Sequence, residues 1–105
     1  MGRVALGDQD GLVLFVHQPD DSFEMHYLLT SDLTGPEKLN RAKAAISWIF
    51  TFTSATRIYG HTPCENRAAR AMNRLLGGRP VRSFADALGR NLITYEVGKD
   101  HELYR

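Results

Sequence analysis

Glu24 and His26 are the first residues in the chain whose types and spacing could do chemistry. They stand two positions apart in a segment, 23–29, that begins with alternating apolar and polar residues. This alternation predicts a strand with both side chains on one face. A carboxylate there could take a proton from an acceptor amine, directly or through water, and histidine titrates near neutral pH. The alternatives are a solvated or ion-paired carboxylate and a hydrogen-bonded structural histidine.

His61 and Cys64 form a second pair, because a thiol in the first turn of a helix ionises readily and a nearby histidine can act as its base. Residues at a strand-to-helix turn need not face each other, and no third group is evident to orient the histidine. We therefore interpret the pair as a chance occurrence. The other histidines lack the spacing of zinc ligands, so we expect no metal site.

Positive charge is concentrated in the middle of the chain. Residues 1–37 carry seven acidic residues and one basic residue, whereas residues 38–82 carry nine basic residues and one acidic residue. Arg67, Arg70 and Arg74 share one face of a predicted helix. This face is either solvated or a site for an anion. Nucleic acid is not the favoured partner, since interleaved exposed aromatics and a binding motif are both missing.

Periodicity and turn residues predict the elements that position these side chains. Strands are expected near 3–6, 12–17, 23–29, 56–60, 81–87 and 92–97. Thr34 and Glu37 have the spacing of a capping box, and apolar residues at helical spacing continue that helix to about Phe52. Thr62 would cap a second helix, with Pro63 in its first turn. The order predicts one domain, residues 1–105, of the α+β or α/β class, with a mixed, mostly antiparallel sheet and two main helices.

Composition restricts the setting of this domain. The 105 residues contain no apolar run of the ~20 residues that cross a bilayer, so we expect no membrane association. The N-terminal decapeptide lacks the apolar segment of a signal peptide. A single cysteine excludes an intramolecular disulfide, which favours the cytoplasm, or that of a host cell if a phage encodes the chain.

One long segment carries a family resemblance. It reads RIYGHTPCENRAARAMNRLLG from Arg57 to Gly77, with Asn66, Ala69 and Gly77 in a strand-then-helix pattern. From Glu24 onward, the order of elements resembles the Gcn5-related N-acetyltransferase (GNAT) superfamily, and within it the short versions found in bacteriophage genomes. The resemblance covers roughly residues 11–105 and rests on the ordered combination, because no single motif is highly specific.

The resemblance implies an acyl-CoA N-acyltransferase-like fold in which two neighbouring strands splay apart around the pantetheine arm of acetyl-CoA. The carrier would pair with the backbone of the strand at 23–30, which ends at Leu29 and Thr30. The pyrophosphate loop would place Asn40 and Arg41 at the phosphates. On the later helix, Asn66, Ala69 and Asn73 would contact the carrier. From the residues alone, a local capping role for Asn66 is equally open.

Three departures from the family pattern affect the expected activity. The loop lacks the usual glycines, and Asn73 stands where many members carry a tyrosine that protonates the departing thiolate. Full enzymes also have a strand and two helices where about ten residues precede Gly11 here. A second subunit is therefore expected to build the acceptor site, or acceptor specificity is low. An aromatic-rich helix end, Trp48 to Phe52, would suit a homodimer interface.

The sequence thus predicts an acetyl-CoA-binding N-acetyltransferase-like protein that acts on an unknown amine, with Glu24 as the base. The alternative is a catalytically inactive GNAT-fold phage structural or interaction protein. A small nucleic-acid-binding module is the third and weakest interpretation.

Overall fold

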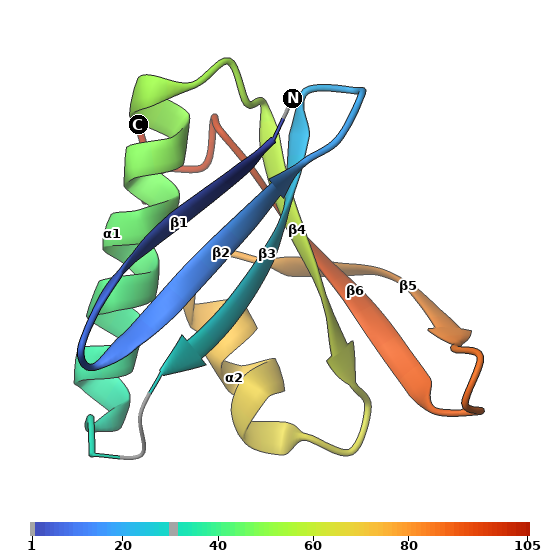
Figure 1. The fold of residues 1–105 in the computed structure, drawn as a ribbon. Coiled ribbons are helices and arrows are strands. Elements are labelled where there is room, and N and C mark those ends of the chain that lie inside the picture. The colour runs from blue at the N-terminus through green and yellow to red at the C-terminus, as the bar shows by residue number, and fades with distance from the viewer. Residues whose placement is uncertain (1, 30–31) are drawn as a thin grey trace.

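The computed structural model describes residues 2–29 and 32–105. Within these residues the chain forms a six-stranded sheet and two helices (Figure 1). The strands and helices follow the order β1 (Arg3–Asp8), β2 (Gly11–His17), β3 (Ser22–Leu29), α1 (Gly35–Phe52), β4 (Arg57–Pro63), α2 (Arg67–Leu75), β5 (Arg79–Ala85) and β6 (Asn91–Gly98). The predicted order and fold class are confirmed.

The strands are arranged in the order β1-β2-β3-β4-β6-β5. β3 and β4 are parallel because α1 carries the chain back across the sheet between them, whereas the other neighbouring strands of the described chain are antiparallel. The β1–β2 hairpin turns tightly at Gly11, whose φ is 143°. A Cβ at this position would lie 2.5 Å from the carbonyl oxygen of Leu28, so both the backbone angle and the space require glycine.

α1 begins with the predicted capping box. The hydroxyl of Thr34 accepts a hydrogen bond from the backbone N–H of Glu37, and the Glu37 carboxylate accepts one from the N–H of Thr34. The helix ends at Phe52, and Thr53 is its C-cap. The side chains that it buries recur at helical spacing and are those of Ala42, Ala45, Ile46, Ile49 and Phe50.

The prediction for the start of α2 is wrong. Thr62 and Pro63 belong to β4, where they lie opposite Ile93 and Leu92 of β6. Asn66 is the N-cap, and its side-chain oxygen accepts a hydrogen bond from the N–H of Ala69. Pairing with β6 therefore extends the strand through residues that alone would suit a helix start.

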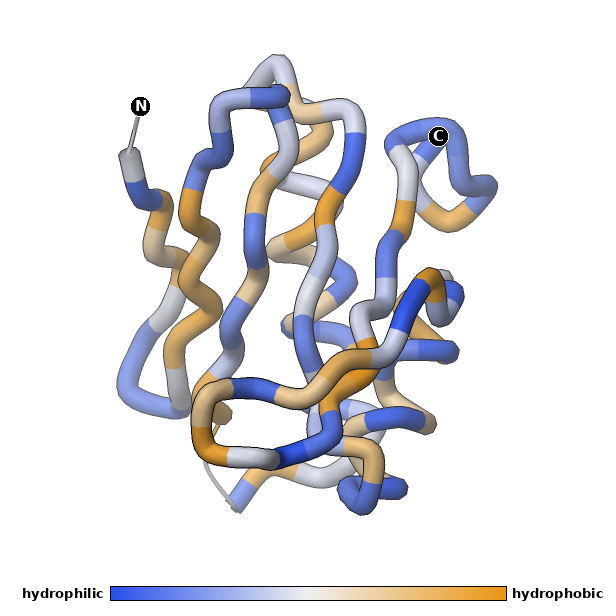
Figure 2. Tube along the Cα trace, turned by 90° about the vertical axis from the view of Figure 1, so that its right-hand side faces the viewer, coloured by the Kyte–Doolittle hydropathy of each residue, from blue (hydrophilic) through white to orange (hydrophobic). Residues whose placement is uncertain are grey.

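Both helices pack on one face of the sheet and share a single core. Phe15, Phe23 and Ile58 point from the strands into this core, which also contains Ile46 of α1 and Leu76 after α2. Figure 2 shows hydrophobic residues concentrated in the strands, while the turns are mostly hydrophilic. The opposite face has no helix over it in the described chain, and we call it the open face.

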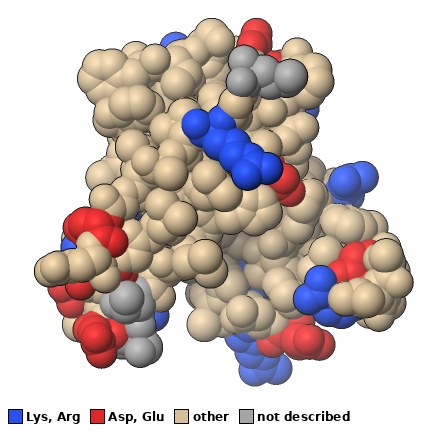
Figure 3. Space-filling model, in the orientation of Figure 1, with Lys and Arg blue, Asp and Glu red and all other residues tan. Residues whose placement is uncertain are grey.

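Charge is distributed unevenly on the surface. In Figure 3, which views the molecule with β1 in front of α1, charged side chains gather toward the hairpin tips and are sparse over the middle. Among the described residues, no helix has both the length and the apolar character needed to span a bilayer.

Candidate active site

β3 and β4 separate soon after they meet. They pair only through Ser22 with Arg57, Phe23 with Ile58 and Glu24 with Tyr59. From Met25 onward β3 has no register partner on β4. The backbone N–H and C=O groups on that edge of β3 therefore lack hydrogen-bond partners on β4. This divergence is the geometry that the family resemblance implied.

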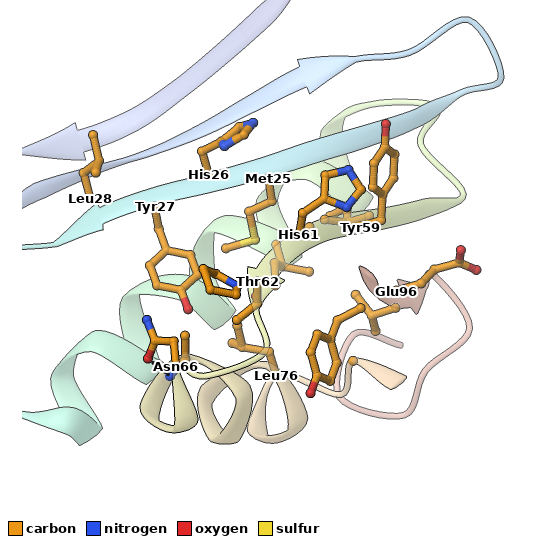
Figure 4. Close-up of a pocket in the computed structure, with 18 residues that line it drawn as sticks. Met25, His26, Tyr27, Leu28, Tyr59, His61, Thr62, Asn66, Leu76 and Glu96 are labelled. Carbon is orange, nitrogen blue, oxygen red and sulfur yellow. Dashed lines mark hydrogen bonds between the residues drawn. The ribbon is translucent and has the colours of Figure 1, made fainter. Parts of the chain in front are cut away.

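A cleft of about 310 Å³ opens where the two strands part. In Figure 4, Met25 and Tyr27 point from β3 toward α2, while His26 and Leu28 point away from it. Asn66 at the start of α2 and Leu76 at its end also line the cleft. The cleft is therefore walled by two diverging strands and by the second helix.

Gly60 keeps the entrance to this cleft open. Gly60 follows Tyr59, the last residue of β4 that pairs with β3, and a Cβ at Gly60 would lie 3.3 Å from the carbonyl oxygen of Met25. Deeper in, the Asn73 side chain donates a hydrogen bond to the hydroxyl of Thr62 at 2.7 Å. This bond ties α2 to β4, so the second helix stays at a fixed distance from the strand.

A second cleft, of about 630 Å³, lies over the open face of β4, β6 and β5. Tyr59, His61 and Glu96 line both clefts. A molecule held between the strands and another resting on the open face would therefore meet at these residues. This is the arrangement that a transfer between two bound substrates requires.

Glu24 on β3 lines neither cleft itself but contacts His61, which lines both. Its two carboxylate oxygens face two histidines, with Oε1 3.4 Å from His26 Nε2 and Oε2 3.4 Å from His61 Nε2. The Glu24 side chain is 23% exposed, so a substrate can still reach it. Burial lowers the pKa of His61, and this effect exceeds the opposing attraction of Glu24. His61 is therefore mainly neutral near pH 7.

The comparisons place this geometry among known structures. No family model and no curated protein matches the sequence. Mycobacterium smegmatis RimJ, in complex with CoA-disulfide, has a TM-score of 0.84 at 17% identity over 96% of this chain and 55% of its own. Spermidine/spermine N-acetyltransferase SpeG from Vibrio cholerae has a TM-score of 0.81 at 17% identity, over 96% and 66%.

A GNAT-family acetyltransferase from Bacillus anthracis has a TM-score of 0.78 at 14% identity, over 87% of this chain and 59% of its own. The chain has the GNAT fold. It spans between 55% and 66% of the length of these three structures. At such identities the likeness establishes the fold, and only this chain's own residues bear on its site.

The predicted carrier-binding residues fall into two groups in this GNAT fold. Asn66 and Ala69 line the cleft between the strands, and Asn73 lies beside it through its bond to Thr62. Leu29 lines a different cavity, under the β1–β2 hairpin. Thr30 lies outside the described residues. The binding role of each stays a prediction.

Asn40 and Arg41 do not lie with the cleft residues. Asn40 is exposed on α1, and the Arg41 guanidinium binds Asp8 at 2.8 Å and Asp10 at 2.9 Å in the β1–β2 turn. The hydrogen bond from Arg41 lowers the pKa of the Asp8 carboxyl. Arg41 therefore already has two anionic partners, and its expected contact with a pyrophosphate stays a prediction.

The start of α1 also differs from an open anion site. The N–H of Glu37 is bonded to Thr34, and Pro36 has no N–H to offer. The Glu37 carboxylate itself occupies this end of the helix and gains from the helix dipole. Residues 34–37 therefore do not fit a cradle for pyrophosphate, whereas the cleft between β3 and β4 does fit an extended, mainly apolar arm.

Sequence reasoning missed the contact of Glu24 with His61 and the phenols of the cleft. Among the described residues, the polar contacts of His61 are with Glu24 and Thr94, which agrees with the interpretation of His61 and Cys64 as a chance pair. Tyr27 and Tyr95 both line the cleft. Alternation along 57–61 could have placed Tyr59 and His61 on one face. This alternation does not show which residues of the adjacent strands lie beside Tyr59 and His61.

The expected aromatic surface is partly buried. Phe50 lies in the core, whereas Trp48 and Phe52 are exposed, with ring centroids 5.1 Å apart. A homodimer through this surface stays a prediction.

Proposed function

We propose that this protein binds acetyl-CoA between β3 and β4 and transfers the acetyl group to an amine. The observation that carries the proposal is the early separation of these strands, with a cleft between them and a second cleft beyond it. The similarity to structures described as N-acetyltransferases, one of them in complex with CoA-disulfide, supports it.

The backbone of β3 would hold the carrier. Its edge from Met25 to Leu29 has N–H and C=O groups with no register partner on β4. The amides of a pantetheine arm can complete this ladder as a further strand would. Asn66 uses its side-chain oxygen to cap α2, which leaves its side-chain N–H groups as donors at the cleft wall.

Glu24 would act as the general base. In the transfer, the acceptor nitrogen bonds to the acetyl carbon, the carbon–sulfur bond breaks, and the nitrogen loses a proton. Glu24 can take this proton, because its partly exposed carboxylate lies beside His61, a residue that lines both clefts. His26 and His61 flank the carboxylate and hold it in place.

The departing thiolate needs a proton that Asn73 cannot supply. An amide is not an acid at neutral pH, and the Asn73 side chain is bonded to Thr62. The phenols that line the cleft are those of Tyr27, Tyr59 and Tyr95. Burial raises the pKa of Tyr27, which keeps it protonated and able to donate.

Thermal melting with and without acetyl-CoA tests the binding step. A ligand bound only by the native state stabilises it by about 2.7 kcal/mol at a hundredfold excess over its Kd. We expect this shift in the natural protein and in Gly98→Ala, whose added Cβ meets only Thr56 at 3.9 Å. Gly60→Val should fold but lose the shift, because its side chain enters the cleft. No shift at millimolar acetyl-CoA in the natural protein would refute the proposal.

Glu24→Gln tests the chemical step separately. We expect acetyl transfer to fall by about 10²–10⁴-fold, the usual contribution of a positioned base. The acetyl-CoA melting shift should stay unchanged, because Glu24 lies beyond the carrier cleft. An unchanged transfer rate would remove Glu24 from the mechanism.

A further inference from the structure

Four polar side chains form a row across the open face, one from each of four neighbouring strands. Arg82 on β5 lies opposite Thr94 on β6, and Thr94 lies opposite His61 on β4. The row ends at Glu24 on β3, which His61 contacts at 3.4 Å. Arg82, Thr94 and His61 also line the larger cleft. The row therefore links one charged end of the cleft to the candidate base.

A β-bulge brings Arg82 into this row. The register between β5 and β6 shifts between Pro80 and Arg82, so that Val81 is an extra residue with no partner. Without the shift, Val81 would lie opposite Thr94 and Arg82 would turn to the helix-covered face. With it, both Val81 and Arg82 line the cleft. Bulges commonly re-aim a side chain beside a functional site, which is the effect here.

Arg82 is the cation in the larger cleft whose charge is left uncompensated. The other arginine, Arg57, binds both Asp20 and Glu96. For Arg82 no carboxylate lies within ion-pair distance in residues 2–29 and 32–105. Its guanidinium carbon lies 4.9 Å from the centre of the Phe84 ring, and only Nε is bonded within the row. The two terminal nitrogens can thus meet a planar carboxylate.

The hydrogen bonds along the row fit one direction. Arg82 Nε can only donate to Thr94 Oγ1, at 3.4 Å. Thr94 Oγ1 lies 2.9 Å from Nδ1 of His61, and Nε2 of His61 faces the Glu24 carboxylate. Burial lowers the pKa of His61, and in the neutral ring a proton on Nε2 leaves Nδ1 to accept from the Thr94 hydroxyl. The two charges at the ends of the row stay separate, positive at Arg82 and negative at Glu24.

We propose that the acceptor is a small aliphatic amine that also carries a carboxylate, with Arg82 binding the carboxylate and Glu24 receiving the amine. This inference rests on the proposed acetyl transfer and adds its substrate class. The guanidinium lies over β6 and the Glu24 carboxylate beside β4, so the two groups of the acceptor must span more than one strand spacing of about 4.8 Å. An amine and a carboxylate separated by several methylene groups meet this requirement.

Acetyl transfer to three amines of equal chain length tests the substrate class. These are 4-aminobutanoate, which carries the carboxylate, butylamine, which lacks it, and 1,4-diaminobutane, which replaces it with a second cation. We expect the highest kcat/KM for 4-aminobutanoate and the lowest for the diamine, which would place a cation at Arg82. Equal or higher kcat/KM for butylamine or the diamine would overturn the inference.

Arg82→Gln shows whether the preference comes from this residue. It should raise KM for 4-aminobutanoate by about tenfold to a hundredfold, as expected for lost charge-assisted hydrogen bonds, and change kcat/KM for butylamine much less. Arg82→Lys should restore part of the loss. Arg79→Gln is the matched control, because Arg79 is on the same strand and face but does not line the cleft. An unchanged KM in Arg82→Gln would overturn the role of Arg82.

Failure of the inference can be told from failure of the proposed function. If acetyl-CoA produces no melting shift in the natural protein, the proposed function itself is refuted. If the shift is present and 4-aminobutanoate neither reacts nor raises the melting temperature further in the presence of CoA, only the substrate class is refuted.

Discussion

The two faces of the sheet are built from the same strands but have different tasks. The helix-covered face contains the shared core and the cleft where β3 and β4 separate. The open face carries Arg82, Thr94, His61 and Glu24 in a row beside the larger cleft. Strand alternation assigns each residue to one face or the other, so neighbours along the chain serve different purposes.

This comparison separates the residues that stabilise the fold from those of the proposed site. Residues on the covered face are fixed by apolar packing, which tolerates little change of volume. In the row on the open face, polar contacts between neighbouring strands fix the side chains; Thr94 is buried, whereas Glu24 and His61 remain partly exposed. Substitutions on the covered face should therefore act mainly on folding, and substitutions on the open face mainly on catalysis and its pH dependence.

Phe15→Ala should give the largest effect and sharpen the comparison most directly. The Phe15 side chain is fully buried and packs edge-on against Phe23, with ring centroids 6.3 Å apart. We expect its loss to lower the free energy of unfolding by about 3–5 kcal/mol, measured by urea denaturation. Leu12→Ala, on the open face of the same strand and 37% exposed, should lower it by about 1 kcal/mol or less. Similar losses in both variants would break the distinction between the faces.

Asn73→Ala should have an intermediate effect and separate structure from binding on the covered face. Asn73 donates to the Thr62 hydroxyl, which is only 7% exposed. Removing the donor should destabilise the fold by about 1–3 kcal/mol in thermal or urea unfolding. Asn40→Ala, at an exposed position of α1, should change stability by less than about 0.5 kcal/mol. A stable Asn73→Ala protein that no longer shifts with acetyl-CoA would instead assign Asn73 to the carrier.

Local patterns predicted the parts of the fold that depend on local forces. The capping box of Thr34 and Glu37 is a contact between residues three apart, and the shared face of Glu24 and His26 follows from alternation alone. Both are confirmed. The start of α2 was wrong because Thr62 and Pro63 suit either a helix start or a strand end, and the distant Ile93 and Leu92 decide between them.

The candidate site was less predictable for the same reason. The row on the open face depends on the register of β3, β4, β6 and β5, and on a bulge whose position the sequence does not signal. The placement of Arg41 depends on the β1–β2 turn, which brings Asp8 and Asp10 to it across some thirty residues of chain. A sequence motif can identify a candidate residue, but the pairing of strands determines which residues it contacts.

His61→Gln should give the smallest effect and tests the electrostatics of the open face. Burial is the main cause that lowers the pKa of His61, aided by Arg82 and His26 and opposed by Glu24. Because the folded-state pKa lies below the ordinary histidine value of 6.5, the unfolded chain binds more protons between the two values, and stability falls as pH falls through that window. We expect the melting temperature to drop between pH 7.5 and pH 5.5, and His61→Gln to reduce that drop. If the substitution enlarges the drop, His61 is protonated in the fold and paired with Glu24, and the directed hydrogen bonds from Arg82 to Glu24 do not hold.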